Sequence, residues 1–190
     1  RTLYSTLRET SHAGPLTREL EGARQVARGE LQQEGFSLTF DASKAGERLD
    51  LRSFRAQAQG GEASGSGTVW LRRTAEATIS LALARLDPSR FGDYPTSTLN
   101  GTALVEARLG GGAERRIAGR WTLERSTLFG ESLGSAGSAV VTGEGERLRV
   151  AQGDATVVLG SLRAEARGTF GAPGDRLAWS VQAPRLDQLP

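Results

Sequence analysis

The sequence predicts an all-β protein in which a curved, mostly antiparallel meander forms an open trough with an apolar concave face. Apolar residues recur at every second position through most of the chain, which is the period of a strand with one apolar and one polar face. The turns between these segments are too short for parallel crossovers, so neighbouring strands are expected to be antiparallel. Hydrophobic residues make up only 37% and aromatic residues 6%, while glycines number 25, which favours a thin open sheet over a thick sandwich.

The clearest example of this alternation is the hairpin from Leu162 to Leu189. Its first half has apolar residues or glycine at alternate positions from 162 to 170, with charged or polar residues between them. After the turn at 172–175 the alternation resumes at Leu177 and continues through Trp179 and Val181. Similar segments precede it, and the most regular of them runs from Leu99 to Leu109.

The first residues differ from the rest. Residues 1–30 are expected to form a leader, because the apolar residues at Leu16, Leu20 and Val26 are more widely spaced. The stretch 16–26 is rich in good helix formers, so we expect either a short helix after Pro15 or irregular chain.

Residues 31–190 are expected to form a single β-trough domain excised from a longer repeat array. The repeat is weak: the run ARLDP at 84–88 resembles APRLD at 183–187, and each follows a hairpin. The apolar phase slips between Ser53 and Phe54, and a β-bulge there would keep both sets of apolar residues on one face. The longest expected loop covers residues 87–97, which contain two prolines and a glycine.

Charge and composition argue against several function classes. The formal net charge is +2, and the basic residues alternate with Asp and Glu as on a solvated face, so nucleic acid is not an expected partner. The chain has no cysteine and one histidine, which excludes disulfides and thiolate metal sites, and no cofactor or metal is expected. No apolar run approaches the length of a membrane-spanning helix.

Two motifs have simpler structural explanations. The sequence GESLG at 130–134 matches the G-x-S-x-G pattern of a hydrolase, but that motif requires a following helix and a downstream histidine. The only histidine is His12, upstream, so we interpret the motif as a Gly/Ser-rich turn. Asn100-Gly101-Thr102 matches a glycosylation sequon but lies within an expected strand. No residue is assigned a catalytic role.

The apolar face itself is therefore the candidate functional feature. Alternating residues often form the core of a sandwich or barrel. Here the stripe is rich in small residues and glycine, which fill a core poorly and allow a sheet to curve. An incompletely filled apolar face is suited to lipid tails. The residues expected to line this groove are Val69, Leu71, Ile79, Leu81, Leu83, Leu99, Val105, Ile117, Trp121, Leu123, Val157, Leu159, Leu162, Leu177, Trp179 and Val181.

Four runs carry a resemblance to a known family: LALARLDPSRFGDYP, LNGTALVEARLGG, IAGRWTLERSTLFGESLGSAGSA and LGSLRAEARGTFGAPGDRLAWSVQAPRLDQL. They resemble the C-terminal half of the TamB family, which belongs to the AsmA-like, bridge-type group of Gram-negative envelope proteins. The resemblance covers about Leu49 to Leu189, with repeated strands that end in glycine and an A-P-x-L-D-x-L ending.

This resemblance implies a long β-taco with an apolar lumen that crosses the periplasm, anchored in the inner membrane by a segment outside this sequence. It implies a translocation and assembly module in which phospholipid acyl chains are shielded in a hydrophobic groove between the inner and outer membranes. The implied partners are phospholipid and an Omp85-type outer-membrane protein, TamA.

Two alternatives remain at this stage. One is a chaperone-like module that assists assembly of outer-membrane β-barrels or autotransporters by strand addition. The other is a structural segment of a surface adhesin.

Overall fold

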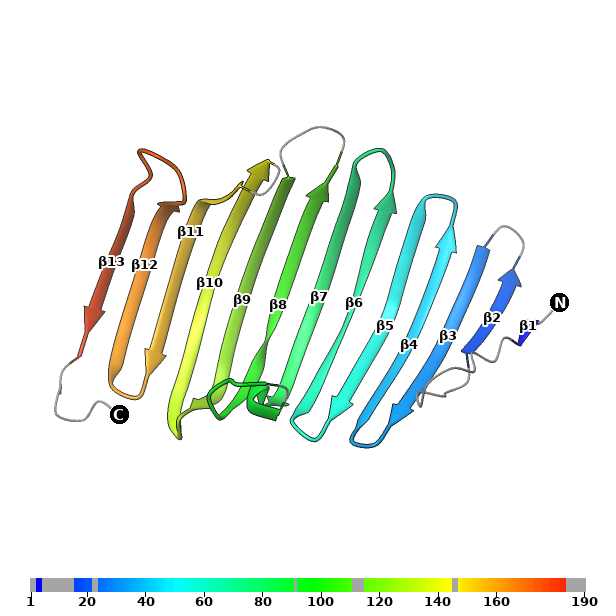
Figure 1. The fold of residues 1–190 in the computed structure, drawn as a ribbon, viewed down its shortest axis with the longest axis horizontal. Helices are drawn as coiled ribbons and strands as arrows, with labels where there is room; N and C mark the ends of the chain where they lie inside the picture. The colour runs from blue at the N-terminus through cyan, green and yellow to red at the C-terminus, as the bar shows by residue number, and fades with distance from the viewer. Residues whose placement is uncertain are drawn as a thin grey trace.

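The computed structural model describes residues 3–4, 16–21, 24–90, 92–110, 115–144 and 147–183. These residues form one antiparallel sheet of 13 strands that follow one another in chain order from β1 to β13 (Figure 1). The sheet is open: β1 and β13 lie at its two opposite ends and do not pair with each other. The all-β meander predicted from the sequence is therefore confirmed, and an open sheet of this kind is consistent with a curved trough.

The strands are longest in the middle of the sheet. β9 and β10 each have 14 residues, which corresponds to a length of about 46 Å. The elements are β1 (Leu3–Tyr4), β2 (Leu16–Glu21), β3 (Arg24–Gln33), β4 (Phe36–Ala45), β5 (Arg48–Ala58), β6 (Gly61–Leu71), β7 (Ala75–Leu86), the 3-10 turn η1 (Pro88–Arg90), β8 (Ser97–Leu109), β9 (Arg115–Leu128), β10 (Glu131–Glu144), β11 (Arg147–Leu159), β12 (Leu162–Phe170) and β13 (Leu177–Gln182).

The expected helix after Pro15 is wrong, and so is the irregular alternative. Residues 16–21 form β2, which pairs with β3 from Leu16 opposite Gly29 to Glu21 opposite Arg24. Helix propensity is a weak prior, and the free edge of β3 offers a full hydrogen-bond ladder that overrides it. β3 also runs through residue 30, so the sheet continues across the expected end of the leader. His12 and the second repeat copy, at 184–187, fall outside the described residues.

The β-bulge expected near Ser53 is confirmed in β5. Asp41 lies opposite Ser53 and Ala42 lies opposite Leu51, so Arg52 is the extra residue. The bulge reverses the phase of the alternation and thereby places Leu51 and Phe54 on the same face. Each of β7, β9 and β11 contains a further register shift of one residue.

The bulges of β7 and β9 lie on either side of β8 and are joined by Asn100. Its Oδ1 accepts a hydrogen bond from the backbone N–H of Arg85 at 2.8 Å, and its Nδ2 donates to the backbone oxygen of Arg125 at 2.9 Å. Arg85 and Arg125 have φ values of 52° and 51°, a left-handed conformation that is uncommon for non-glycine residues. The Ser126 hydroxyl, 2% exposed, accepts from the backbone N–H of Asn100 at 2.8 Å. The amide of the sequon thus holds two bulged strands together.

The turn expected at GESLG is confirmed at Gly130 only, because residues 131–134 are part of strand β10. Gly130 occupies the β9–β10 turn with φ 83°, and the rest of GESLG continues directly into strand β10 rather than a helix. The loop after β7 begins at Asp87, whose Oδ1 accepts hydrogen bonds from the Ser89 hydroxyl at 2.7 Å and the Ser97 backbone N–H at 3.2 Å. The hydrogen bond from the Ser89 side chain, more than any other interaction, lowers the pKa of Asp87.

Replacement of the bridging amide should loosen the middle of the sheet. Asn100→Ala leaves the N–H of Arg85 and the C=O of Arg125 without these partners, so we expect a loss of about 1–3 kcal/mol in the free energy of unfolding. Urea denaturation monitored by circular dichroism measures it. Thr102→Ala, on the same strand and exposed, is the control and should change stability by less than about 0.5 kcal/mol. Equal stability of the two variants would contradict the bridging role.

The Asp87 loop should respond to acid. Because the pKa of Asp87 is lowered in the folded protein, its hydrogen bonds stabilise the loop above the ordinary Asp pKa, about 3.9, and this is lost as pH falls through the lower folded value. We expect the Ser97 amide resonance to titrate with a midpoint below about 3.9 in NMR spectra. Ser89→Ala should move that midpoint upward, and Asp87→Asn should abolish the titration. A midpoint that Ser89→Ala leaves unchanged would refute this origin of the shift.

Candidate apolar binding face

A row of apolar residues and glycines crosses the sheet from β5 to β13. Directly paired residues in an antiparallel sheet point to the same face, so the register alone groups these side chains. We call the face that carries this row the apolar face and its reverse the polar face. The row consists of Phe54, Gly65, Leu81, Ala103, Trp121, Gly137, Ala155, Ala166 and Trp179.

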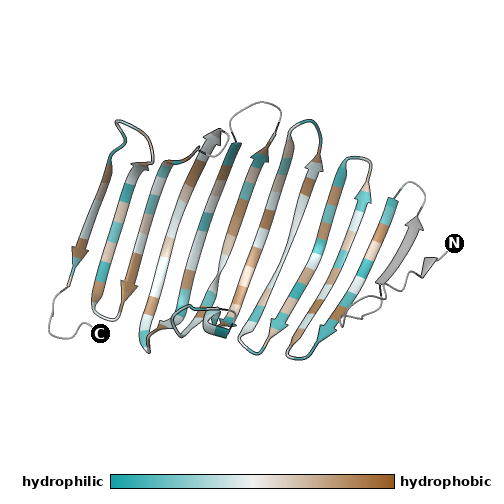
Figure 2. Ribbon diagram, viewed as in Figure 1, coloured by the Kyte–Doolittle hydropathy of each residue, from teal (hydrophilic) through white to brown (hydrophobic). Residues whose placement is uncertain are grey.

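The parallel rows on either side of it belong to the same face. One contains Ile79 and Val105, which pair directly, and the other contains Leu83, Leu123 and Val157. Every residue of the expected groove lining lies on the apolar face. Each either pairs directly with a residue of these rows or is separated from one by an even number of positions along an unbulged part of its strand. Figure 2 shows the resulting alternation of hydrophobic and hydrophilic positions along the strands. Whether these residues contact a lipid stays a prediction.

The described part of the chain has no second layer over this face. Among the described residues, Val26 and Leu133 are the only large apolar side chains that are buried. Trp179 is 73% exposed and Phe170 is 64% exposed. The accessible surface of 13406 Å² compares with about 8,800 Å² for a compact protein of this mass. The apolar face is therefore open to solvent along the sheet.

Several large side chains on the apolar face lie against the glycine of the neighbouring strand. A Cβ on Gly65 would lie 2.8 Å from the Phe54 ring, and a Cβ on Gly137 would lie 2.6 Å from the Trp121 ring. The Trp121 indole N–H also donates to the Ser135 hydroxyl at 3.1 Å. The glycines expected to leave room on this face are thus partly covered by these rings, an arrangement known to protect strand glycines.

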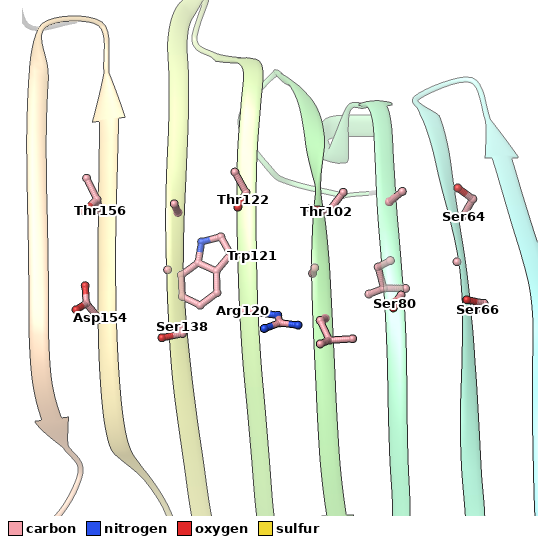
Figure 3. A pocket seen from close by; sticks show the side chains of 17 residues that line it. Ser64, Ser66, Ser80, Thr102, Arg120, Trp121, Thr122, Ser138, Asp154 and Thr156 are labelled. Atoms are coloured by element: carbon pink, nitrogen blue, oxygen red, sulfur yellow. The ribbon is translucent and has the colours of Figure 1, made fainter.

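A broad hollow lies on the polar face. It has a volume of about 910 Å³ and crosses β6 to β11. Figure 3 shows the short hydroxyl side chains around it, together with Arg120 and Asp154. The hydroxyl residues are Ser64, Ser66, Ser80, Thr102, Thr122, Ser138 and Thr156. They alternate with the apolar row, and their short side chains leave depth between the longer ones. These Ser and Thr residues can be read in the sequence of each strand, but the sequence analysis did not predict that they line a hollow.

Ion pairs connect neighbouring strands on the polar face. Arg28 and Arg52 approach Asp41 at 3.2 and 3.5 Å, Arg55 approaches Glu62 at 2.7 Å, and β11 and β12 are linked by a further pair. The hydrogen bond from Arg55 is the main cause of the lowered pKa of Glu62. These groups are partly or largely exposed, so solvent screens the pairs and each contributes little to stability. The polar face is a solvated face, as the alternating charges predicted.

The chemistry of the described residues is limited. They contain no group of three or more His, Cys, Asp or Glu side chains placed to hold a metal ion. Within the same residues, no helix is long and apolar enough to cross a membrane. The apolar face offers hydrophobic contact.

Comparison of this chain with protein-family models, with curated proteins and with solved structures finds no match. The resemblance to the TamB family therefore rests on the sequence runs that carry it.

The contact between Trp121 and Gly137 should make that glycine intolerant of a side chain. In Gly137→Ala the new methyl group would meet the indole and the Asp154 carbonyl oxygen, 2.7 Å away, so we expect a loss of about 1–3 kcal/mol and a shift in tryptophan fluorescence. Gly119→Ala, on the same face of the adjacent strand, is the matched control, because its nearest atom is 4.0 Å away. It should be neutral or stabilising by less than about 1 kcal/mol. Equal costs measured by urea denaturation would disprove the contact.

Proposed function

We propose that the chain is a non-enzymatic segment of a lipid-transport bridge, which shields phospholipid acyl chains from water on its apolar face. The observation that supports this most is the continuous, uncovered apolar face from β5 to β13. Soluble monomers rarely expose apolar areas of this extent, and those that do use them to bind a partner, a ligand or a membrane.

The dimensions of the sheet suit an acyl chain. The hydrocarbon of one bilayer leaflet is about 15 Å thick, half of the ~30 Å core. Strands of 14 residues are about three times that length. Burial of each CH₂ group contributes roughly 0.8 kcal/mol, so even partial coverage of a tail is favourable. Because rings and aliphatic side chains lie over the glycines, the face offers shallow contacts along which a tail could slide.

The biological setting is part of the same proposal. The sequence resemblance to the TamB family supports a place in the periplasm, in a translocation and assembly module that moves phospholipid from the inner to the outer membrane. An Omp85-type outer-membrane protein of the TamA kind would be the partner. The one-dimensional, open sheet suits this role, because further strands at either end would extend the apolar face.

Acyl-chain binding is tested by charge placed on each face. Mass spectrometry of the purified chain should detect bound phospholipid. The double variant Leu81→Asp/Val105→Asp should lower the phospholipid occupancy at least about tenfold, because a bound tail would desolvate the carboxylates on the apolar face. The controls are Ala82→Asp with Leu104→Asp, neighbours in sequence that point to the polar face. These should retain lipid.

Circular dichroism of all variants separates binding from folding. Equal lipid occupancy in both pairs of variants would refute binding at the apolar face. Unfolding of the Leu81/Val105 variant, with the control intact, would show instead that the face is a packed core.

Strand addition is the second candidate, and the edge of β13 favours it. All six residues of β13 are exposed, and within the described residues this strand pairs only with β12. It contains neither proline nor lysine, residues that commonly protect a free edge from pairing. An extended polypeptide could therefore continue the ladder there.

Photo-crosslinking in cells distinguishes the two cargoes. A photoreactive residue at position 81 should capture lipid, and one at position 180 should capture polypeptide only if strand addition occurs. Polypeptide captured at position 81 with no lipid would favour the second candidate over the first.

A further inference from the structure

The two long rims of the sheet differ in charge. The C-terminal ends of β2, β4, β6, β8, β10 and β12 and the N-terminal ends of β3, β5, β7, β9, β11 and β13 lie along one rim, at the top of Figure 1, and the opposite ends of these strands lie along the other rim. We call them the upper and the lower rim, and each comprises the two outermost residues at every strand end together with the described residues that connect these ends.

The upper rim is basic. Among side chains that the structure describes, it carries Arg24, Lys44, Arg48, Arg72, Arg73, Arg108, Arg115, Arg116 and Arg176 against Glu47, Glu76 and Asp175. The lower rim carries Arg85, Arg90 and Arg163 against Glu34, Glu62, Asp87, Asp93 and Glu131. The sequence has five further charged residues in or beside these connections whose side chains are not described, namely Glu21, Glu114, Glu144, Glu146 and Arg147, and the sum of formal charges stays positive when all five are added.

Part of this positive charge is not neutralised. Arg48, Arg72 and Arg108 pair with carboxylates at distances of 2.8 to 3.5 Å. Arg73 and Arg116, by contrast, are exposed and make none of the ion pairs found in the described part of the chain. Arg115 and Arg176 are likewise exposed and outside those pairs. These free guanidinium groups are available to an anionic partner.

Exposed apolar side chains lie next to the arginines of this rim. Leu71 is 48% exposed and precedes Arg72, and Leu109 is 41% exposed and follows Arg108. The same adjacency recurs at Ile117 and Leu177, which neighbour Arg116 and Arg176. In addition, the ring of Trp70 lies between Arg48 and Arg72, with the guanidinium carbons 5.4 and 4.5 Å from its centroid. Basic side chains, exposed apolar side chains and one tryptophan thus occur together on the upper rim.

We infer that the upper rim docks on the surface of an anionic phospholipid bilayer. Arginines attract anionic headgroups, exposed leucines enter the interfacial region, and tryptophan favours the boundary between the two. The lower rim lacks this excess of basic charge, so the sheet would meet the membrane along one rim only. The docking goes beyond the proposed function and depends on the rim alone. Transfer of tails from the bilayer onto the adjoining apolar face is a further step that rests on the proposed function.

Vesicle binding tests the docking. Sedimentation with vesicles of equal parts phosphatidylglycerol and phosphatidylcholine should recover the wild-type chain, and neutral phosphatidylcholine vesicles should not. Each charge near the surface contributes about fivefold in affinity, so Arg72→Ser, Arg73→Ser, Arg115→Ser and Arg116→Ser together should weaken binding at least about a hundredfold. The matched control, Arg55→Ser, Arg120→Ser, Arg163→Ser and Arg167→Ser, has the same net charge and should lose less than about tenfold.

The outcomes separate the rim from the apolar face. Equal losses in the two variants, or equal binding to neutral vesicles, would overturn the docking inference. The neutral fluorescent probe N-phenyl-1-naphthylamine, added without vesicles, reports on the apolar face alone. Retention of this probe by the upper-rim variant, with loss of vesicle binding, supports the inference. Failure of the wild-type chain to bind the probe would count against the proposed function, while the vesicle assay alone would still decide the docking.

Discussion

The hydrogen-bond ladder between consecutive strands is the interaction on which this structure depends. Each strand from β2 to β12 pairs with its two neighbours in the chain, and no layer of described residues covers either face. Stability then comes from the ladder and from side-chain pairs within a face, each of which is worth only about 0.2–1 kcal/mol. An isolated hairpin is marginal, whereas an interior strand gains from two neighbours. The sheet is therefore expected to be more stable in the middle than at β1 and β13.

The ladder also imposes a strict condition on the two faces. A slip of one residue in one strand would exchange its apolar and polar sides, so each extra residue must be matched by the pattern of the sequence. Arg52 shows how this works: the bulge in β5 comes where the alternation changes phase, and both halves of the strand keep their apolar residues on one face. Asn100 compensates for the bulges of β7 and β9. Its side-chain amide supplies hydrogen-bond partners for the backbone N–H of Arg85 and the backbone C=O of Arg125.

Alternation along the strands carried enough information to predict the all-β meander, the bulge in β5 and the grouping of apolar residues that the register shows. It failed at residues 16–26, because composition suggested a helix while the decisive factor was pairing with β3. It also did not reveal that the Trp121 ring lies against Gly137, or that a hollow of about 910 Å³ lies on the polar face. Both depend on contacts between strands, and a single strand's pattern does not specify which residues will lie opposite one another.

A one-layer sheet presents three kinds of surface at once, and each has its own chemistry. The apolar face offers hydrophobic contact, the edge of β13 offers main-chain groups that no other described strand pairs with, and the upper rim offers guanidinium groups beside exposed leucines. Because these surfaces point in different directions, occupation of one does not block the others. A tail on the apolar face would also stabilise the folded sheet through ordinary binding linkage, because the unfolded chain has no such face. Binding of such a tail would therefore be coupled to folding stability, and variants that alter the apolar face are best measured for both.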